Sequence, residues 1–475
     1  MTAFRFSRVA MLRRSRAMVS STRLWKSRLV FWTGALAIGA ISVGFAKAAD
    51  FAQRTFATFA GTEEFHYAPL LITPLGFVLC AWLAWRYFPG TQGSGIPQAI
   101  AARHLRDVPD RGGMLSLRIA VGKVFLTVAG MFCGASIGRE GPTVQVGASI
   151  MMLSGRFGGI AEGRGLILAG SAAGIAAAFN TPLAGIVFAI EEMSRSYKAR
   201  TNGMVLSTVI IAGVASLAIL GNYTYFGKSH VVLDQARDWV LVLSCGLAGG
   251  VMGAIFSRGV LSVSRRMRRW RGASPRSKML LLALVAGIIT AIVGVGSGGE
   301  TWGTGYEQAR SAIEGEAPPA SFFLFKLIST LVATVSGIPG GLFAPSLSVG
   351  AGLGSSVALA LGSDIGLAAI LGMAAYFAGV TQAPMTAIVI IIEMTGGHDI
   401  IVPVMAAAML GYGTARVITP EPLYAALSRP FIADALRQVR AREAALRAAE
   451  KAAEAAMETT SAAPEPGAPQ PPARG

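Results

Sequence analysis

Charge is scarce in this sequence, and so are the side chains from which catalytic centres are usually built. Only 14% of the 475 residues are charged, and there are three cysteines and four histidines. Cys80, Cys133 and Cys245 are scattered through apolar segments without the spacing of a metal or redox site, so we expect neither metal nor cofactor. The histidines all lie near polar connections, which disfavours an intramembrane hydrolase with a Ser and His pair. We therefore do not expect an enzyme.

The sequence is rich in hydrophobic residues and long apolar runs. Hydrophobic residues make up 53% of the chain and the mean hydropathy is +0.55, which is typical of a membrane protein. Apolar runs at residues 29–46, 69–85, 279–295 and 365–380 approach the roughly 20 residues that cross a bilayer. Several are short or interrupted by glycine and proline. We predict an all-α polytopic membrane protein with tilted and broken helices, surrounded by lipid.

The charges that are present are mostly positive, with 42 Lys and Arg against 25 Asp and Glu. They gather in connections and tails, notably residues 1–28 and 264–278, rather than on one folded face, so we expect no nucleic-acid partner. The positive-inside rule makes both segments cytoplasmic and predicts an inner (plasma) membrane protein with both termini cytoplasmic. The first apolar run resembles a signal peptide, but its 18 residues exceed the usual core of about 7 to 15, which favours a first span.

The sequence repeats itself at an offset of 202 to 203 residues. GSG at 93–95 recurs at 296–298, GREGPTVQVGA at 138–148 aligns with GLFAPSLSVGA at 341–351, and residues 170–192 align with 372–394. Packing of small residues between membrane helices explains the glycine and alanine matches, but not the matched prolines and glutamate. We predict two repeats, and repeats of this kind commonly form a substrate site at their interface.

The repeats define the expected domains. A basic segment, residues 1–30, precedes a transport domain, residues 31–430, whose repeats cover about 31–225 and 236–430. Residues 431–475 follow as a cytoplasmic Ala, Arg and Glu-rich helix and a disordered proline-rich tail.

The repeats also separate the acidic residues into two groups. Glu191 has a counterpart in Glu393, so we interpret both as scaffold carboxylates that bind loop or helix-end amides. Glu140 and Glu192 have no acidic counterpart in the other repeat. Because a duplication keeps in both copies what the fold needs, acids present in one repeat only are the better functional candidates.

GREGP, residues 138–142, has the pattern of a helix start within the membrane. Proline suits a first helical turn and glycine allows a sharp turn before it. GLFAP at 341–345 and GSGIP at 93–97 have the same pattern, and three helix N-termini together favour a small anion. Glu140 is itself an anion at such a site, so it either gates the site until protonated or simply caps its helix.

These motifs resemble the CLC family of chloride channels and proton/chloride exchangers. The resemblance is carried by five segments in family order: GSGIP, GREGPTVQ (138–145), FNTPLAGIVFAIEE (179–192), GIPGGLFAPSLSVGAG (337–352) and PLY (422–424). It implies a homodimer with one pore in each subunit, transporting chloride ions and protons. Each subunit would consist of two inverted-topology repeats of tilted and broken helices. No paired regulatory domains of the cystathionine-β-synthase type follow the membrane part.

The resemblance also implies residue roles. A central chloride would be held by two hydroxyls and two backbone N–H groups, those of Ser94, Tyr424, Leu342 and Phe343. An external site would be lined by the backbone of Gly138, Arg139, Glu140 and Gly141. Glu140 matches the external gate and proton carrier, and Glu192 the internal proton station.

Two functions stay open at this point, proton-coupled chloride exchange and a passive voltage-gated chloride channel that uses Glu140 as a gate only. Glu192 favours exchange, because the family's channels generally lack an acid there. Gln98 stands where many relatives have an acid, which leaves the coupling ratio open. Lys123 is expected either to stabilise nearby acids or to add positive potential, and Tyr424 is either a ligand or an interfacial anchor.

Overall fold

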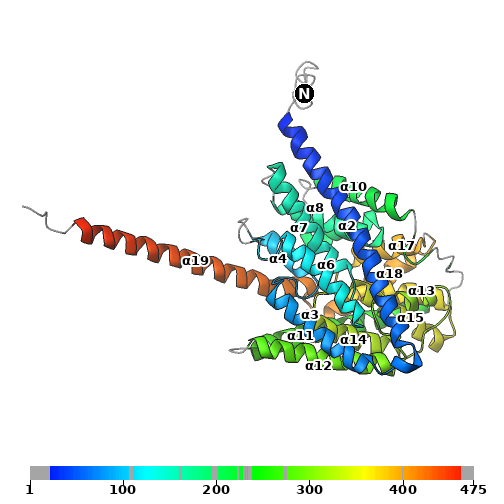
Figure 1. Cartoon of the computed structure of the whole chain (residues 1–475). Helices are drawn as coiled ribbons and strands as arrows, with labels where there is room; N and C mark the ends of the chain where they lie inside the picture. The colour runs from blue at the N-terminus through cyan, green and yellow to red at the C-terminus, as the bar shows by residue number, and fades with distance from the viewer. Residues whose placement is uncertain are drawn as a thin grey trace, which may run out of the picture.

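The computed structural model describes residues 22–105, 111–159, 163–194, 202–221, 224–227, 231, 233, 238–271, 275–397 and 399–461 (Figure 1). Within these ranges the chain is helical, apart from turns and two isolated β-bridges. Most of the basic N-terminal segment, residues 1–21, and the proline-rich end, residues 462–475, lie outside the described residues.

The helices follow one another in two series of similar order. The first series contains α2 (Thr22–Ala60), α3 (Pro69–Arg86), α4 (Ile96–His104), α6 (Leu117–Phe132), α7 (Glu140–Gly158), α8 (Gly163–Phe179), α9 (Pro182–Phe188) and α10 (Asn202–Leu220). The second contains α11 (Asp238–Arg271), α12 (Pro275–Gly296), α13 (Tyr306–Ile313), α14 (Phe322–Val335), α15 (Phe343–Leu361), α16 (Ile365–Thr381), α17 (Pro384–Thr395), α18 (Ile401–Ile418) and α19 (Leu423–Ser461).

The predicted repeats are confirmed by the backbone. α7 and α15 both have 19 residues, and α8 and α16 both have 17. The residues that follow α8 and α16, Asn180 and Gln382, are the non-glycine residues of the described chain with positive φ, at 56° and 57°. Each of them is followed two residues later by the proline that begins the next helix, α9 or α17.

The prediction of a multi-pass membrane protein with broken helices is also confirmed. Among the described residues, seven helices are long and apolar enough to cross a membrane, and four further apolar helices have only 10–17 residues. Two of the short helices, α8 and α16, consist almost entirely of buried residues. The longer helices therefore surround short ones that end within the protein, where neighbouring segments can satisfy the free helix ends.

Close helix packing depends on paired glycines at equivalent places in the two repeats. A Cβ on Gly147 of α7 would lie 2.3 Å from the carbonyl oxygen of Gly170 on α8. A Cβ on Gly372 of α16 would likewise lie 2.3 Å from the carbonyl oxygen of Gly350 on α15. Backbones that approach this closely hold the N-termini of α7 and α15 in place through their partner helices.

The first helix is longer than its apolar run predicts. α2 continues beyond residues 29–46 to Ala60, through a stretch that includes Asp50 and Arg54. Hydropathy falls in this stretch, but the helix continues because its polar side chains contact other segments. Asp50 pairs with Arg139, and Arg54 pairs with Glu307. At the other end of the chain, α19 crosses the expected domain boundary at residue 430 without a break and projects away from the helical body in Figure 1.

Candidate functional site

α7 and α15 begin at neighbouring points of the molecule. Gly138 and Gly341 form an antiparallel bridge in which each N–H donates to the other's carbonyl at 2.7 Å. The loop before α4 joins them, because the Gly93 N–H donates to the Ile338 carbonyl and the Gly93 carbonyl accepts from the Gly340 N–H, both at 3.1 Å. The three glycine-rich motifs that were predicted to hold an anion therefore meet.

Glu140 occupies this meeting point. It is completely buried at the start of α7, and its Oε2 accepts a 3.4 Å hydrogen bond from the Ala344 N–H in the first turn of α15. Its Oε1 has no hydrogen-bond partner among the described residues. A Cβ on Gly138 would lie 2.3 Å from Oε2, so glycine leaves the space that the carboxylate fills. The carboxylate thus lies where the dipoles of two helix N-termini favour negative charge.

Two buried hydroxyls lie beside the same backbone. A Cβ on Gly141 would be 2.3 Å from Ser94 Oγ, and the Tyr424 ring lies 5.7 Å from the ring of Phe343. Within the described part of the chain, the hydroxyls of Ser94 and Tyr424 lie close enough to interact with each other, but neither makes a hydrogen bond of full geometry to a protein group. Buried hydroxyls usually have a partner, so these two are available to a ligand. Leu342, the residue before α15, is buried in the same place.

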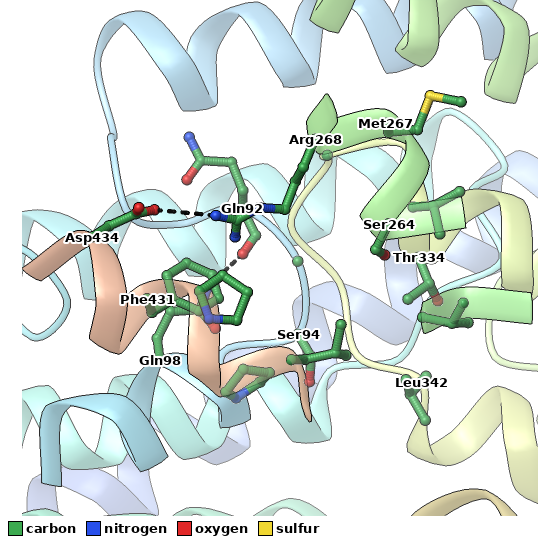
Figure 2. A pocket seen from close by; sticks show the side chains of 17 residues that line it. Gln92, Ser94, Gln98, Ser264, Met267, Arg268, Thr334, Leu342, Phe431 and Asp434 are labelled. Carbon is green, nitrogen blue, oxygen red and sulfur yellow. Dashed lines mark hydrogen bonds and ion pairs between the residues drawn. The ribbon is translucent and has the colours of Figure 1, made fainter. Parts of the chain in front are cut away.

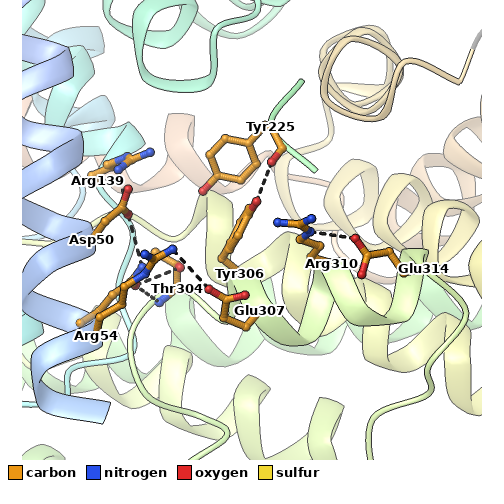
Figure 3. A network of polar contacts seen from close by, with 10 residues as sticks. Asp50, Arg54, Arg139, Tyr225, Thr304, Tyr306, Glu307, Arg310 and Glu314 are labelled. Atoms are coloured by element: carbon orange, nitrogen blue, oxygen red, sulfur yellow. Dashed lines mark hydrogen bonds and ion pairs between the residues drawn. The ribbon is translucent and has the colours of Figure 1, made fainter. Parts of the chain in front are cut away.

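The backbone of Arg139 lies at the site, whereas its guanidinium contacts α2. Arg139 Nη1 donates to the Ala46 carbonyl at 2.8 Å and to Asp50 Oδ1 at 3.0 Å, both on α2. Figure 3 shows Arg139 beside Asp50. Farther along α2, Gln53 Oε1 accepts from the Thr304 N–H at 3.1 Å. This network ties the segment that carries Glu140 to the first helix and to the loop before α13.

Glu192 lies in an irregular turn that the sequence did not reveal. It is 3% exposed and belongs to a π-helical turn, Ala189–Ser194, directly after α9. Arg103, at the end of α4, holds this turn through the Met193 carbonyl at 2.9 Å and the Ser194 hydroxyl at 3.0 Å. Tyr424 is within electrostatic range of both Glu192 and Glu140. Single π turns inside helices often mark functional positions.

Glu191 and Glu393 cap the helices of the opposite repeats. Glu191 accepts from the Met385 and Thr386 N–H groups at the start of α17, at 3.1 and 2.6 Å. Glu393 accepts from two N–H groups at the start of α9 at 3.1 and 2.7 Å, those of Leu183 and Ala184. The interpretation of both acids as scaffold is confirmed, and it separates Glu191 from its neighbour Glu192.

Lys123 binds carbonyl groups. Its buried Nζ donates to the Thr91 and Gly93 carbonyls, both at 2.6 Å, in the loop that leads to Ser94. Lys326, 203 residues later, is equally buried and binds two carbonyls at 2.9 and 2.8 Å, those of Thr301 and Gly303. Of the two roles expected for Lys123, its contacts support neither directly. They make it a clamp that holds the Ser94 loop.

We expect Lys123→Met to weaken both the fold and anion binding. The buried Thr91 carbonyl would lose its donor, at a cost of about 1–3 kcal/mol, the Gly93 carbonyl would keep the Gly340 N–H, and the Ser94 loop would lose its anchor. Thermal unfolding in detergent and the chloride dependence of flux would measure the two effects. Lys326→Met is the matched control, with a similar loss of stability and a smaller loss of chloride affinity. Equal losses of affinity would show that Lys123 does not act through Ser94.

Two buried glutamines complete the site's support. Gln98 Oε1 accepts from the Gly95 N–H at 3.1 Å, and its Nε2 donates to the Gln92 carbonyl. Gln145 Nε2 donates to the Gly90 carbonyl at 3.1 Å and to a second backbone carbonyl. A carboxylate at position 98 could accept the first bond but could not donate the second. The amide therefore fits this loop for a reason that the motif alone did not show.

A cavity of about 430 Å³ extends from the site toward solvent (Figure 2). Its deep part is lined by Ser94 and Leu342, which are 6% and 1% exposed. Its outer part is lined by the last turns of α11 and by α19. Among the described residues, no group of three or more His, Cys, Asp or Glu side chains is arranged to hold a metal ion.

Known proteins share both sequence and fold with this chain. The H(+)/Cl(-) exchange transporter ClcA of Yersinia pestis bv. Antiqua (strain Angola) is 29% identical over 417 residues, which cover 82% of this chain and 84% of the relative. The ClcA of Citrobacter koseri is 31% identical over 412 residues, with coverage of 82% and 85%.

Solved structures of antiporters are similar in fold to this chain. A slow cyanobacterial Cl⁻/H⁺ antiporter superposes with a TM-score of 0.73 at 25% identity, covering 86% of this chain and 98% of the antiporter. A CLC-type fluoride/proton antiporter is similar in fold, with a TM-score of 0.71 at 24% identity and coverage of 86% and 99%. The sequence model of voltage-gated chloride channels matches residues 75–416, and the chain belongs to this family.

Proposed function

We propose that this protein exchanges chloride for protons across a membrane, by a pathway in each subunit. The single observation that carries the proposal is the buried carboxylate of Glu140 at the joined N-termini of α7 and α15. A carboxylate and a chloride ion compete for such a place, because both are anions stabilised by the same N–H groups and helix dipoles. Protonation removes the charge of Glu140 and its preference for the site. The similarity to relatives named as H(+)/Cl(-) exchange transporters supports the proposal.

In this proposal chloride has two positions. The central ion contacts the Ser94 and Tyr424 hydroxyls and two backbone N–H groups, those of Leu342 and Phe343. The external ion replaces the Glu140 carboxylate beside the backbone of residues 138–141. Burying a bare ion costs on the order of 20 kcal/mol, whereas each charge-assisted hydrogen bond returns roughly 1.5–3 kcal/mol, so several donors are required. Neutral donors also let the ion leave again.

Protons take a second route, on which Glu192 is the internal station and Glu140 the external carrier. Glu192 is the feature that favours exchange over a passive voltage-gated channel with Glu140 as gate only. Its carboxylate is buried at a π-helical turn, and it has no acidic counterpart in the other repeat, whereas the neighbouring Glu191 caps α17. A buried acid of this kind in a membrane protein is by default a functional candidate.

We further propose the setting of the protein. The basic segments at residues 1–28 and 264–278 favour an inner (plasma) membrane location with both termini in the cytoplasm. The homodimer implied by the family resemblance is part of the proposal, with a complete pathway in each protomer. The protein acts as a transporter rather than an enzyme and requires no cofactor.

The test uses purified protein in liposomes with a chloride gradient, no proton gradient and the membrane potential held near zero. We expect chloride moving down its gradient to drive protons the other way, so the internal pH changes. Glu192→Gln should abolish the pH change and retain chloride flux, because an amide cannot pass on a proton. Chloride flux without proton movement in the unaltered protein would instead identify a channel.

A further inference from the structure

The outer part of the cavity contains one ion pair, formed between α11 and α19. Arg268, near the end of α11, and Asp434, on α19, are the only charged residues among the described residues that line the cavity. Figure 2 shows the pair above Ser94, with a dashed line between Arg268 and Asp434. Their side chains are 43% and 50% exposed, so the pair lies at the mouth, whereas Ser94 lies at the deep end.

The geometry of this pair is loose. Arg268 Nη2 and Asp434 Oδ2 are 3.8 Å apart, which is beyond hydrogen-bonding range. The other carboxylate oxygen of Asp434 contacts Arg437, one turn further along α19. Asp434 therefore interacts with two arginines, and it accepts no hydrogen bond from Arg268.

Arg139 and Asp50 show what a structural ion pair looks like in the same protein. The Arg139 side chain is 5% exposed and reaches Asp50 at 3.0 Å with hydrogen-bond geometry. Compared with that pair, the Arg268 contact is longer and far more exposed to solvent and salt. Exposed pairs of this kind contribute little to stability and open readily. Stabilisation of the fold therefore does not account well for this ion pair.

We propose that Arg268 is a staging site for chloride at the cavity mouth, and that Asp434 competes with chloride for it. A cation at the entrance of a narrow cavity that is otherwise lined by uncharged side chains raises the local concentration of small anions there. A carboxylate beside it neutralises this attraction whenever the pair is closed. Chloride and the Asp434 carboxylate are alternative partners of Arg268, so the pair sets how readily the cavity fills. This inference rests on the proposed function and names a residue outside the two chloride positions described there.

The two charges should therefore have opposite effects. We expect Arg268→Gln to raise the chloride concentration for half-maximal current about two- to fivefold when chloride is varied on the cavity side, and Asp434→Asn to lower it. Arg268→Lys keeps the charge and should remain close to the unaltered protein. Current across a planar bilayer, with chloride varied on one side at a time and gluconate as the replacement anion, would measure each shift.

A control and the opposite outcome separate this role from others. Arg265→Gln removes the same charge from α11 at an exposed residue that does not line the cavity, so it should leave the chloride dependence unchanged. If Arg268→Gln and Asp434→Asn shift it in the same direction, the pair only ties α11 to α19 and the staging site is wrong. An equal shift on both sides of the membrane would also overturn it. Absence of chloride current in the unaltered protein would contradict the proposed function itself.

Discussion

Glu140→Gln is expected to abolish proton movement while chloride flux continues. The amide carries no charge at any pH, so it neither transports a proton nor competes as an anion for the helix N-termini. The variant keeps the size of the side chain, and its carbonyl oxygen can still accept from the Ala344 N–H. Proton movement measured as internal pH should fall to background, and chloride flux should become independent of pH.

Glu314→Gln is the matched control for this experiment. Glu314 is an exposed acid, 56% accessible, that pairs with Arg310 on α13 at some distance from the joined helix starts (Figure 3). Its loss should leave the pH dependence of chloride flux as it was. If Glu140→Gln still moved protons against their gradient, another group would carry them, and the carboxylate of Glu140 would be only a helix cap.

Glu393→Gln and Glu191→Gln are expected to reduce stability strongly and leave the coupling of chloride to protons intact. Each carboxylate accepts two N–H groups at the start of a helix in the other repeat. The amide removes the charge and replaces one acceptor with a donor, which should cost about 2–5 kcal/mol. Thermal unfolding in detergent, together with the ratio of chloride to proton flux, would test both statements.

Glu192→Gln provides the comparison, because it changes the adjacent residue in the same way. Its unfolding temperature should stay the same or rise, since a buried charge is removed, while its proton flux disappears. Opposite results, with Glu191→Gln stable but uncoupled, would exchange the roles of the two neighbouring acids. The two measurements therefore distinguish scaffold from transport within one dipeptide.

Much of the site could be predicted because the chain contains two copies of one pattern. The repeat alignment identified Glu140 and Glu192 as acids of one half only, and it placed Glu191 with Glu393. The motif order then identified Ser94 and its backbone neighbours as a group, and the structure brings them together. These predictions were possible because acidic residues are rare in an apolar chain, so each one stands out when the two repeats are aligned.

The supporting contacts could not be predicted, because their partners are backbone atoms. Lys123 was recognised as unusual, but its two carbonyl acceptors have no sequence signal. Arg103 and the π-helical turn that it holds depend on how α4 meets α9, which local periodicity does not report. The polar half of α2 was missed for a related reason, since hydropathy detects the membrane core and not a helix continued by paired charges.

The reciprocal caps have a consequence for how this protein is made. The N–H groups at the start of α9 donate to Glu393, which follows Leu183 by 210 residues and is therefore synthesised later. At about 5–20 residues per second, the first half spends roughly 10–40 s in the membrane before its partner is synthesised. During that interval the start of α9 lacks the carboxylate that accepts its N–H groups. The nascent chain is therefore most vulnerable to misassembly and quality control before its second half arrives.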